Sequence, residues 1–232
     1  MFKSRSYQEE LLDDPAVPKE ALFQNLRELE TINKYLGGHA VSLKGLEKII
    51  ADQKKNPTIV DIGCGGGDAL KSMAAWGKRK RYQFKLTGAD LKEDCISFAR
   101  KNCKEYPEID FVPTDFRNIF TQLEKGDIVH ASLFFHHFRE NDIISFIKLC
   151  SENKVRCIIN DLERNPIAYY SIKWITQLFS NSYLVKNDAP LSVLRGFKKK
   201  EWQQVLKAAG IKKYSIENKW AFRHLIIIYP NE

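Results

Sequence analysis

The fold is decided by residues 58–70, which read TIVDIGCGGGDAL. The stretch opens with β-branched apolar residues, which favour a buried strand, and then passes through an aspartate into a cluster of glycines. A helix-compatible segment follows over residues 69–76. Glycine adopts positive φ without strain and lets a ligand lie against the backbone. This strand, turn and helix therefore predict a binding site for a nucleotide-like ligand, the alternative being a turn without a ligand.

The spacing of the glycines separates the possible ligands. A phosphate-binding loop needs a glycine before its lysine, but the residue before Lys71 is leucine. A dinucleotide-binding loop needs a small residue at its third glycine position, which falls here on Asp68 or Leu70. The remaining pattern, D-x-G-x-G-x-G from Asp61 to Gly67, resembles motif I of the class I S-adenosylmethionine (SAM)-dependent methyltransferases. The acidic residues also suit a cationic ligand better than a phosphate.

The rest of the chain predicts an α/β fold with a doubly wound sheet of seven strands. The first strand is the apolar run before the glycines, and the others are expected over residues 84–89, 110–113, 127–133, 156–161, 213–217 and 223–229. Helices are expected over residues 93–104, 142–152 and 199–209. The crossovers make the first five strands parallel, and the short link between the last two favours an antiparallel hairpin. The class I methyltransferase sheet has this terminal hairpin.

Three regions are expected along the chain. Residues 1–56 form an N-terminal helical extension, with one helix that ends at Gly37-Gly38 and a second over residues 43–52. Residues 57–232 form the SAM-binding domain. Within it, residues 162–198 form an insertion whose helix is apolar on both faces and must be covered on two sides. By the resemblance, such an insertion lies above the SAM site as a lid, and a dimer contact is the competing interpretation.

Acidic residues end two of the expected strands. A carboxylate such as Asp90 accepts both hydroxyls of a ribose, although it also suits the N-cap of the next helix. The resemblance implies that Asp115 binds the adenine amino group. Phe116 is a candidate to stack on the base, with a position in the core as the alternative. The residues expected to bind SAM, or its product S-adenosylhomocysteine (SAH), are Asp61, Gly63, Cys64, Gly65, Gly67, Asp90, Leu91, Asp115, Phe116 and Ser132.

The fourth strand leads into ASLFFHHF at residues 131–138, which resembles the small-molecule methyltransferases of quinone and polyketide tailoring. Methyl transfer from a sulfonium requires alignment of the acceptor and removal of its proton, and an imidazole suits a phenol, hydroxyl or carboxyl acceptor. His137 is the first candidate for this base and His136 the second; the alternative is that both are structural. The Asn/Asp-Pro-Pro-Tyr/Phe tetrapeptide of nucleic-acid amino methyltransferases does not occur.

The acceptor site is expected to be apolar and aromatic. Tyr169, Tyr170 and Trp174 of the insertion are candidates to contact the acceptor. Arg195 is a candidate to hold an acidic group, with a structural ion pair as the alternative, and His39 is a candidate to line the pocket or to bond locally.

Composition limits the other possibilities. The five cysteines are odd in number and contain no C-x-x-C pair, so they predict reduced packing residues and no metal site. No apolar run reaches membrane-spanning length and no apolar signal core occurs near Met1, so we expect a soluble, cytoplasmic protein. The net charge of +8 raises nucleic acid as a partner, but the runs at residues 78–81 and 198–200 are interpreted as solvated turns.

Together these observations predict SAM-dependent methylation of a small, largely apolar acceptor, most simply at oxygen, by a monomer or homodimer. Nucleic acid is an unlikely partner in this interpretation. Two alternatives remain open. One is an RNA or protein methyltransferase, which the positive charge favours. The other is a non-catalytic SAM-binding module.

Overall fold

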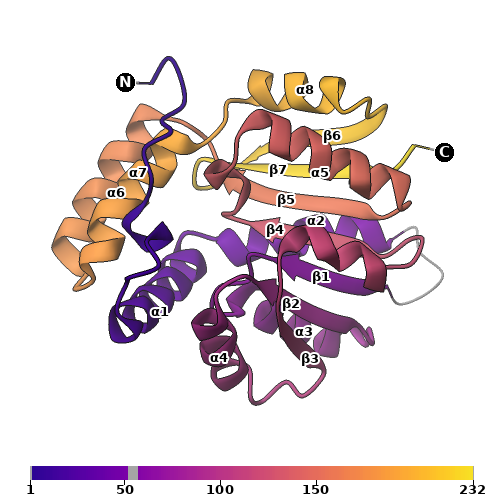
Figure 1. Cartoon of the computed structure of the whole chain (residues 1–232), viewed down its shortest axis with the longest axis horizontal. Helices are drawn as coiled ribbons and strands as arrows, with labels where there is room; N and C mark the ends of the chain where they lie inside the picture. The colour runs from indigo at the N-terminus through magenta and orange to yellow at the C-terminus, as the bar shows by residue number, and fades with distance from the viewer. Residues whose placement is uncertain (1, 52–56, 232) are drawn as a thin grey trace.

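The computed structural model describes residues 2–51 and 57–231 and contains a seven-stranded sheet with helices on both faces (Figure 1). The strands follow the spatial order β3-β2-β1-β4-β5-β7-β6. Their bounds are β1 Thr58–Ile62, β2 Lys85–Asp90, β3 Ile109–Pro113, β4 Ile128–Ser132, β5 Arg156–Leu162, β6 Lys213–Lys219 and β7 Arg223–Tyr229. The predicted doubly wound fold is therefore confirmed.

The direction of the strands places the site. Strands β1 to β5 are parallel and β7 pairs antiparallel with β6, as the sequence predicted. Strand β7 also pairs antiparallel with β5. The strand order reverses between β1 and β4, and open α/β sheets bind ligands at the carboxyl ends on either side of such a reversal. The glycine-rich loop follows β1 at this point.

The helices form two layers around the sheet. Apolar side chains of α2, α3 and α4 pack on one face, and those of α5 and α8 pack on the other. The helices are α1 Lys19–Tyr35, α2 Gly38–Ile50, α3 Asp68–Lys80, α4 Glu93–Asn102, α5 Glu140–Glu152, α6 Pro166–Phe179, α7 Tyr183–Arg195 and α8 Lys199–Ala208, with short 3-10 helices η1 Leu11–Asp13, η2 Phe116–Gln122 and η3 Phe135–His137.

Helix α2 starts earlier than predicted and belongs to the layer on the sheet. Gly37 adopts φ 76, which reverses the chain after α1 and lets α2 begin at Gly38 rather than at residue 43. A Cβ at Gly45 would lie 2.7 Å from Ile158 of β5, so the helix backbone lies directly against the sheet. The predicted end of this helix at Asp52 and the boundary at residue 56 lie outside the described residues.

The insertion between β5 and α8 differs from its prediction in two ways. It contains a second helix, α7, although Pro190 lies inside it and removes a backbone donor. Helix α6 packs against α7, yet its other face is exposed, so the expected burial on two sides is wrong within this chain. The exposed apolar side chains of α6 are Ile167, Tyr170, Trp174, Ile175, Leu178 and Phe179.

The N-terminal segment crosses α7 before it reaches α1 (Figure 1). The Ser6 amide donates to Leu194 O at 3.0 Å. The amides of Leu11 and Leu12 donate to the two carboxylate oxygens of Asp188, at 2.8 and 2.9 Å. This segment thereby brings η1 to the carboxyl ends of β4 and β5. No helix among the described residues is long and apolar enough to cross a membrane.

Candidate active site

A cavity of about 430 Å³ lies at the carboxyl ends of β1 to β4, and we call it cavity 1. Its wall combines the glycine-rich loop, acidic residues at strand ends, and apolar residues of α1 and of the segment after β4. All of the predicted SAM-binding residues except Gly67 line it, namely Asp61, Gly63, Cys64, Gly65, Asp90, Leu91, Asp115, Phe116 and Ser132. The sequence did not predict the contribution of α1, which is Leu26, Leu29 and Asn33.

Two glycines of the loop are required for different structural reasons. Gly63 has φ 62, and a Cβ there would lie 2.1 Å from the ring of Phe134, which itself lines cavity 1. Gly67 has φ 75 and is the N-cap of α3, and a Cβ there would lie 2.9 Å from Phe111 in the core. Gly67 is therefore needed for packing of the helix against the sheet, rather than as a wall of the cavity.

Asp61 is held by a partner that the sequence analysis missed. His130 of β4 lies beside Asp61 in the sheet, and its Nδ1 is 2.6 Å from Asp61 Oδ1. The second ring nitrogen is 2.8 Å from Ser42 Oγ of α2. Burial raises the pKa of Asp61, although the contact with His130 opposes this shift. His130 gives no sequence signal because it looks like an ordinary mid-strand residue, and only the parallel register brings it to Asp61.

His39 lies beneath the loop and does not line cavity 1. Its Nε2 is 2.7 Å from Asp68 Oδ2, and Asn33 Nδ2 donates to the same oxygen at 3.1 Å. Burial acts to raise the pKa of Asp68, but the hydrogen bonds from His39 and Asn33 outweigh it and the pKa is lowered. His39 thus anchors the first residue of α3, which corresponds to the local bonding role left open by the sequence.

Asp90 and Asp115 both present carboxylates to cavity 1, but their pKa values are shifted in opposite directions. Asp90 accepts from the amides of Gly65 and Lys92 at 3.0 and 2.9 Å, and burial raises its pKa against the effect of these bonds. Each of its oxygens keeps a second lone pair, which suits the two hydroxyls of a ribose. Asp115 is more exposed and bonds to Arg117, which lowers the pKa of Asp115.

These residues fit an adenosyl ligand that carries a cationic methionine portion. Buried Asp61 and partly buried Asp68 lie beside the glycine-rich loop, Asp90 ends β2, and Asp115 with the Phe116 ring follows β3. The cavity volume falls within the range of about 300–1,000 Å³ that small ligands occupy. Carboxylates in place of basic residues at the loop favour a cation over a phosphate.

A second cavity of about 350 Å³, cavity 2, adjoins the first. Side chains of α1, α6, α7 and the β6–β7 turn line it, and most of them are apolar. Four residues line both cavities, which are Leu12, Leu29, Leu133 and His137. Leu133 has φ 53, a strained conformation for a residue with a branched side chain. The two cavities therefore meet immediately after β4.

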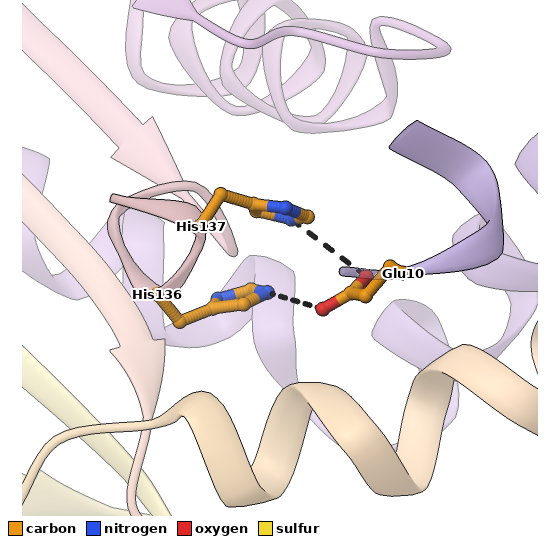
Figure 2. A group of neighbouring side chains, drawn as sticks. All are labelled: Glu10, His136 and His137. Atoms are coloured by element: carbon orange, nitrogen blue, oxygen red, sulfur yellow. Dashed lines mark ion pairs between the residues drawn. The ribbon is translucent and has the colours of Figure 1, made fainter. Parts of the chain in front are cut away.

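The histidines after β4 lie at this junction and face Glu10 (Figure 2). His136 Nε2 is 3.6 Å from Glu10 Oε1, and His137 Nε2 is 3.8 Å from Glu10 Oε2. Glu10 is buried, and burial raises its pKa in opposition to nearby His137, Ser192 and Arg195. His137 lines both cavities, whereas His136 is buried and lines only cavity 2.

Each of these histidines has a carboxylate at its other ring nitrogen. His136 Nδ1 is 2.7 Å from Asp161 Oδ1, and the His136 amide donates to Asp161 Oδ2 at 3.1 Å. Burial acts to raise the pKa of Asp161, but His136 outweighs it and the pKa is lowered. His137 Nδ1 is 3.3 Å from Asp13 Oδ1. Both imidazoles are thus oriented by acids behind them.

The predicted acceptor contacts on α6 do not line either cavity. Tyr169 and Tyr170 pack against Phe2, and Trp174 is 67% exposed. The lining of cavity 2 comes from the opposite side of the same helix, through Ala168, Ser171 and Ile172, and from the partly exposed Ile175 at its edge. The sequence could not assign the inward side, because apolar residues occur all round α6.

Arg195 is occupied by contacts within the protein. Its Nη1 and Nη2 donate to Gln8 O and His137 O at 3.0 Å, and Asp13 Oδ2 lies 3.4 Å from Nη1. The buried arginine that lines cavity 2 is instead Arg223, which donates to Asn33 and Asn160 and makes no ion pair within the described residues. Burial lowers the pKa of Arg223 to about 10.

Known proteins match this chain in sequence and in fold. Residues 59–153 match the family model described as a methyltransferase domain. Over 59 residues the chain is 32% identical to the mitochondrial ubiquinone biosynthesis O-methyltransferase of Saccharomyces cerevisiae, a match that covers 25% of this chain and 18% of that protein. The chain thus spans less than a fifth of this curated relative's length.

Two solved structures extend the comparison across most of the chain. The plantazolicin methyltransferase BamL, in complex with a triazolic desmethylPZN analog and SAH, has a TM-score of 0.65 at 17% identity and covers 93% of this chain and 92% of its own. The magnesium protoporphyrin IX methyltransferase (ChlM) of Synechocystis PCC 6803, with bound SAH, has a TM-score of 0.53 at 17% identity and covers 84% of each chain. Residues 59–153 thus match a methyltransferase domain, and the sheet as a whole has the fold of these solved methyltransferases.

Proposed function

We propose that this protein transfers a methyl group from SAM to a small, largely apolar acceptor, at an oxygen atom. The observation that carries the proposal is the meeting of the two cavities at Leu133 and His137. One cavity presents carboxylates and a glycine-rich loop, and the other presents mainly apolar side chains. A methyl donor and its acceptor need such adjoining compartments, because the reaction is an in-line displacement that depends on alignment.

The assignment of cavity 1 to SAM rests on its acidic residues and on two solved structures with the same fold. When bound, SAM supplies a methyl group on a positively charged sulfur. Asp90 would accept the ribose hydroxyls, Asp61 and the loop would face the methionine portion, and Asp115 with Phe116 would meet the adenine. Both BamL and ChlM, which share the fold, are described with SAH.

The assignment of cavity 2 to the acceptor rests on its chemistry. Its apolar wall suits a hydrocarbon or aromatic body, whereas Arg223 and the two histidines make one region polar. Arg223 is buried, and its side chain donates to the amide oxygens of Asn33 and Asn160, so an acceptor that carries a carboxylate would give this guanidinium an anionic partner. The yeast relative is itself named an O-methyltransferase.

His137 is the group we place at the acceptor's oxygen, since it alone of the two histidines lines both cavities. With Asp13 at Nδ1, Nε2 is the nitrogen that would accept the acceptor's proton. His136 is buried against Asp161 and supports the position of this segment.

Calorimetry on the purified chain tests the cofactor assignment. Replacement of Asp90 by asparagine should weaken SAM and SAH binding by about 10- to 100-fold, because a charge-assisted partner of the ribose is lost. Asp110→Asn is the matched control, since Asp110 is exposed on β3 and lines neither cavity. Unchanged affinity in Asp90→Asn, or tighter binding of NAD than of SAM, would contradict the assignment.

Methyl transfer from isotope-labelled SAM to a panel of phenols, hydroxy acids and carboxylic acids tests the reaction. We expect labelled product with acceptors that have an apolar body, and His137→Gln should lower turnover by about 10²- to 10⁴-fold while SAM affinity stays unchanged. SAM binding without transfer to any acceptor, RNA and protein included, would favour a non-catalytic module instead.

A further inference from the structure

We propose that Glu10, His136 and His137 bind a divalent transition-metal ion, best matched by Zn²⁺, at the junction of the two cavities. Each residue offers one ligand atom, and these atoms lie within 4.8 Å of one another. Figure 2 shows both imidazoles turned toward the carboxylate of Glu10, which approaches from the N-terminal segment. All three side chains line cavity 2.

The distances between the histidine Nε2 atoms and the Glu10 oxygens suit a shared metal ion better than direct hydrogen bonds. The Nε2 atoms of His136 and His137 lie 3.6 and 3.8 Å from the oxygens of Glu10, which is too long for a hydrogen bond. Metal–ligand bonds of about 2.0–2.2 Å in a tetrahedral site separate neighbouring ligand atoms by roughly 3.3–3.6 Å. The two distances involve different oxygens of Glu10, and the three ligand atoms lie within 4.8 Å of one another, so the side chains would close around the ion to reach that range.

The carboxylates at the Nδ1 atoms of His136 and His137 orient the Nε2 lone pairs of both rings toward Glu10. Asp161 Oδ1 lies 2.7 Å from His136 Nδ1, and Asp13 Oδ1 lies 3.3 Å from His137 Nδ1. A neutral imidazole that donates its Nδ1 proton to an acid has an unprotonated Nε2. Metal-binding histidines almost always have such a partner at the second nitrogen, and here both do.

The charges around the cluster leave a deficit of positive charge. Glu10, Asp13 and Asp161 carry carboxylates, and the guanidinium that reaches Glu10 and Asp13 belongs to Arg195. The nearby Arg5 is paired with Glu140. The charge of Arg223 acts on Asp161. With both imidazoles neutral, three carboxylates against two guanidinium groups leave one negative charge, which a bound cation would offset.

The ligand set selects the kind of ion. Two histidines and one glutamate bind Zn²⁺ in hydrolytic sites that keep a fourth position for water or substrate, and imidazole suits transition metals rather than Mg²⁺ or Ca²⁺. The fourth position here would face cavity 2. If the proposed function holds, that position receives the acceptor's oxygen, and the ion lowers the pKa of its hydroxyl in place of direct proton removal by His137.

Titration with Zn²⁺ and Co²⁺ after chelator treatment, on the full chain without SAM, tests the site. We expect one ion per chain and a Co²⁺ absorption spectrum of a nitrogen- and oxygen-coordinated tetrahedral centre. Glu10→Gln and His137→Gln should each weaken binding by more than 100-fold, and Asp13→Asn by about 10- to 100-fold, since it orients a ligand. Glu9→Gln, at the exposed neighbouring position, is the control and should bind as the unmodified chain does.

Three results would overturn the proposal. One is the absence of Zn²⁺ and Co²⁺ binding. Another is binding that survives both Glu10→Gln and His137→Gln, and the third is a thiolate charge-transfer band, which would assign the ion to cysteine. Circular dichroism melting checks that each variant is folded, and His137→Gln is the safer variant because its side chain is 21% exposed. SAM affinity is measured on the same samples, so failure of the metal site and failure of the cofactor assignment are distinguishable.

Discussion

At the scale of single residues, the glycine-rich loop depends on side chains that are far away in the sequence. Gly63 has positive φ and also lies against Phe134, which lines cavity 1. A side chain at this position would therefore cause two problems. It would strain the backbone, and it would push an aromatic ring into the space that we assign to SAM.

Two glycine-to-alanine variants separate these effects. Gly210 also has positive φ, at 74, but a Cβ there would meet nothing within 4 Å. Gly210→Ala should lower the free energy of unfolding by about 1–2 kcal/mol through backbone strain alone, with SAM affinity unchanged. Gly63→Ala should cost more stability and also weaken SAM binding. Denaturant unfolding and calorimetry measure the two quantities, and equal results for both variants would show that the contact with Phe134 is unimportant.

The acids of cavity 1 were predictable as single residues, whereas the cluster at the junction was not. Asp61 and Asp90 end strands whose apolar pattern is visible in the sequence, so their common edge follows from the parallel sheet. Glu10 reaches His136 only because the N-terminal segment crosses α7. Contacts between segments so distant in sequence leave no periodic pattern, and the sequence accordingly predicted no metal ligands.

At the scale of elements, the two sides of α6 have different environments. Ile172 lines cavity 2, whereas Trp174 lies two residues further along and is exposed. If cavity 2 holds the acceptor, these neighbours should respond differently to truncation, because only one of them contributes contact area to the acceptor.

Truncation of Ile172 and of Trp174 provides a matched pair. Ile172→Ala should raise the Michaelis constant for an apolar acceptor by about 10-fold or more, as expected when methylene contacts in a pocket are lost. Trp174→Ala should leave it unchanged, which reverses the expectation drawn from the sequence. Steady-state kinetics at saturating SAM measures both. A larger effect for Trp174 would mean that the acceptor binds on the exposed side of α6.

The order and type of most elements could be predicted from the sequence, because the strands are apolar, short and separated by amphipathic helices. Helix α7 was missed, since it contains Pro190 and its buried residues do not follow one narrow stripe. The helix predicted over residues 69–76 was also too short, since α3 spans Asp68–Lys80. Its last turn carries Lys78, Arg79 and Lys80, and cations are favourable at a helix C-terminus, so the basic run extends the helix instead of forming a turn.

At the scale of the whole molecule, the densest basic run is separated from the chemistry. Helix α3 begins at Asp68, beside cavity 1, and its exposed basic residues lie one helix length away, about 20 Å, near the amino end of the sheet. The second run, at residues 198–200, begins α8 and is exposed as well.

Neutralisation of the run at residues 78–81 by glutamine tests whether the charge serves the reaction. SAM affinity and methyl transfer to a small acceptor should stay within about two-fold, while weak, salt-sensitive binding to RNA should fall. Radiometric transfer assays and filter binding at two salt concentrations measure these effects. If methyl transfer collapsed in a variant that melts normally, a macromolecular acceptor would be the better interpretation.

The crossing of the N-terminal segment over α7 determines when each cavity can exist during folding. Arg5 and η1 contact residues 188–195, so these parts of cavity 2 assemble only after nearly the whole chain is available. Leu12 and Asp13 of this segment also line cavity 1, but the strands that carry Asp61, Asp90 and Asp115 lie closer together in sequence, and such contacts form sooner than those that close long loops. Refolding should therefore restore SAM binding before acceptor or Zn²⁺ binding, so that a newly made chain holds its methyl donor before it has anything to methylate.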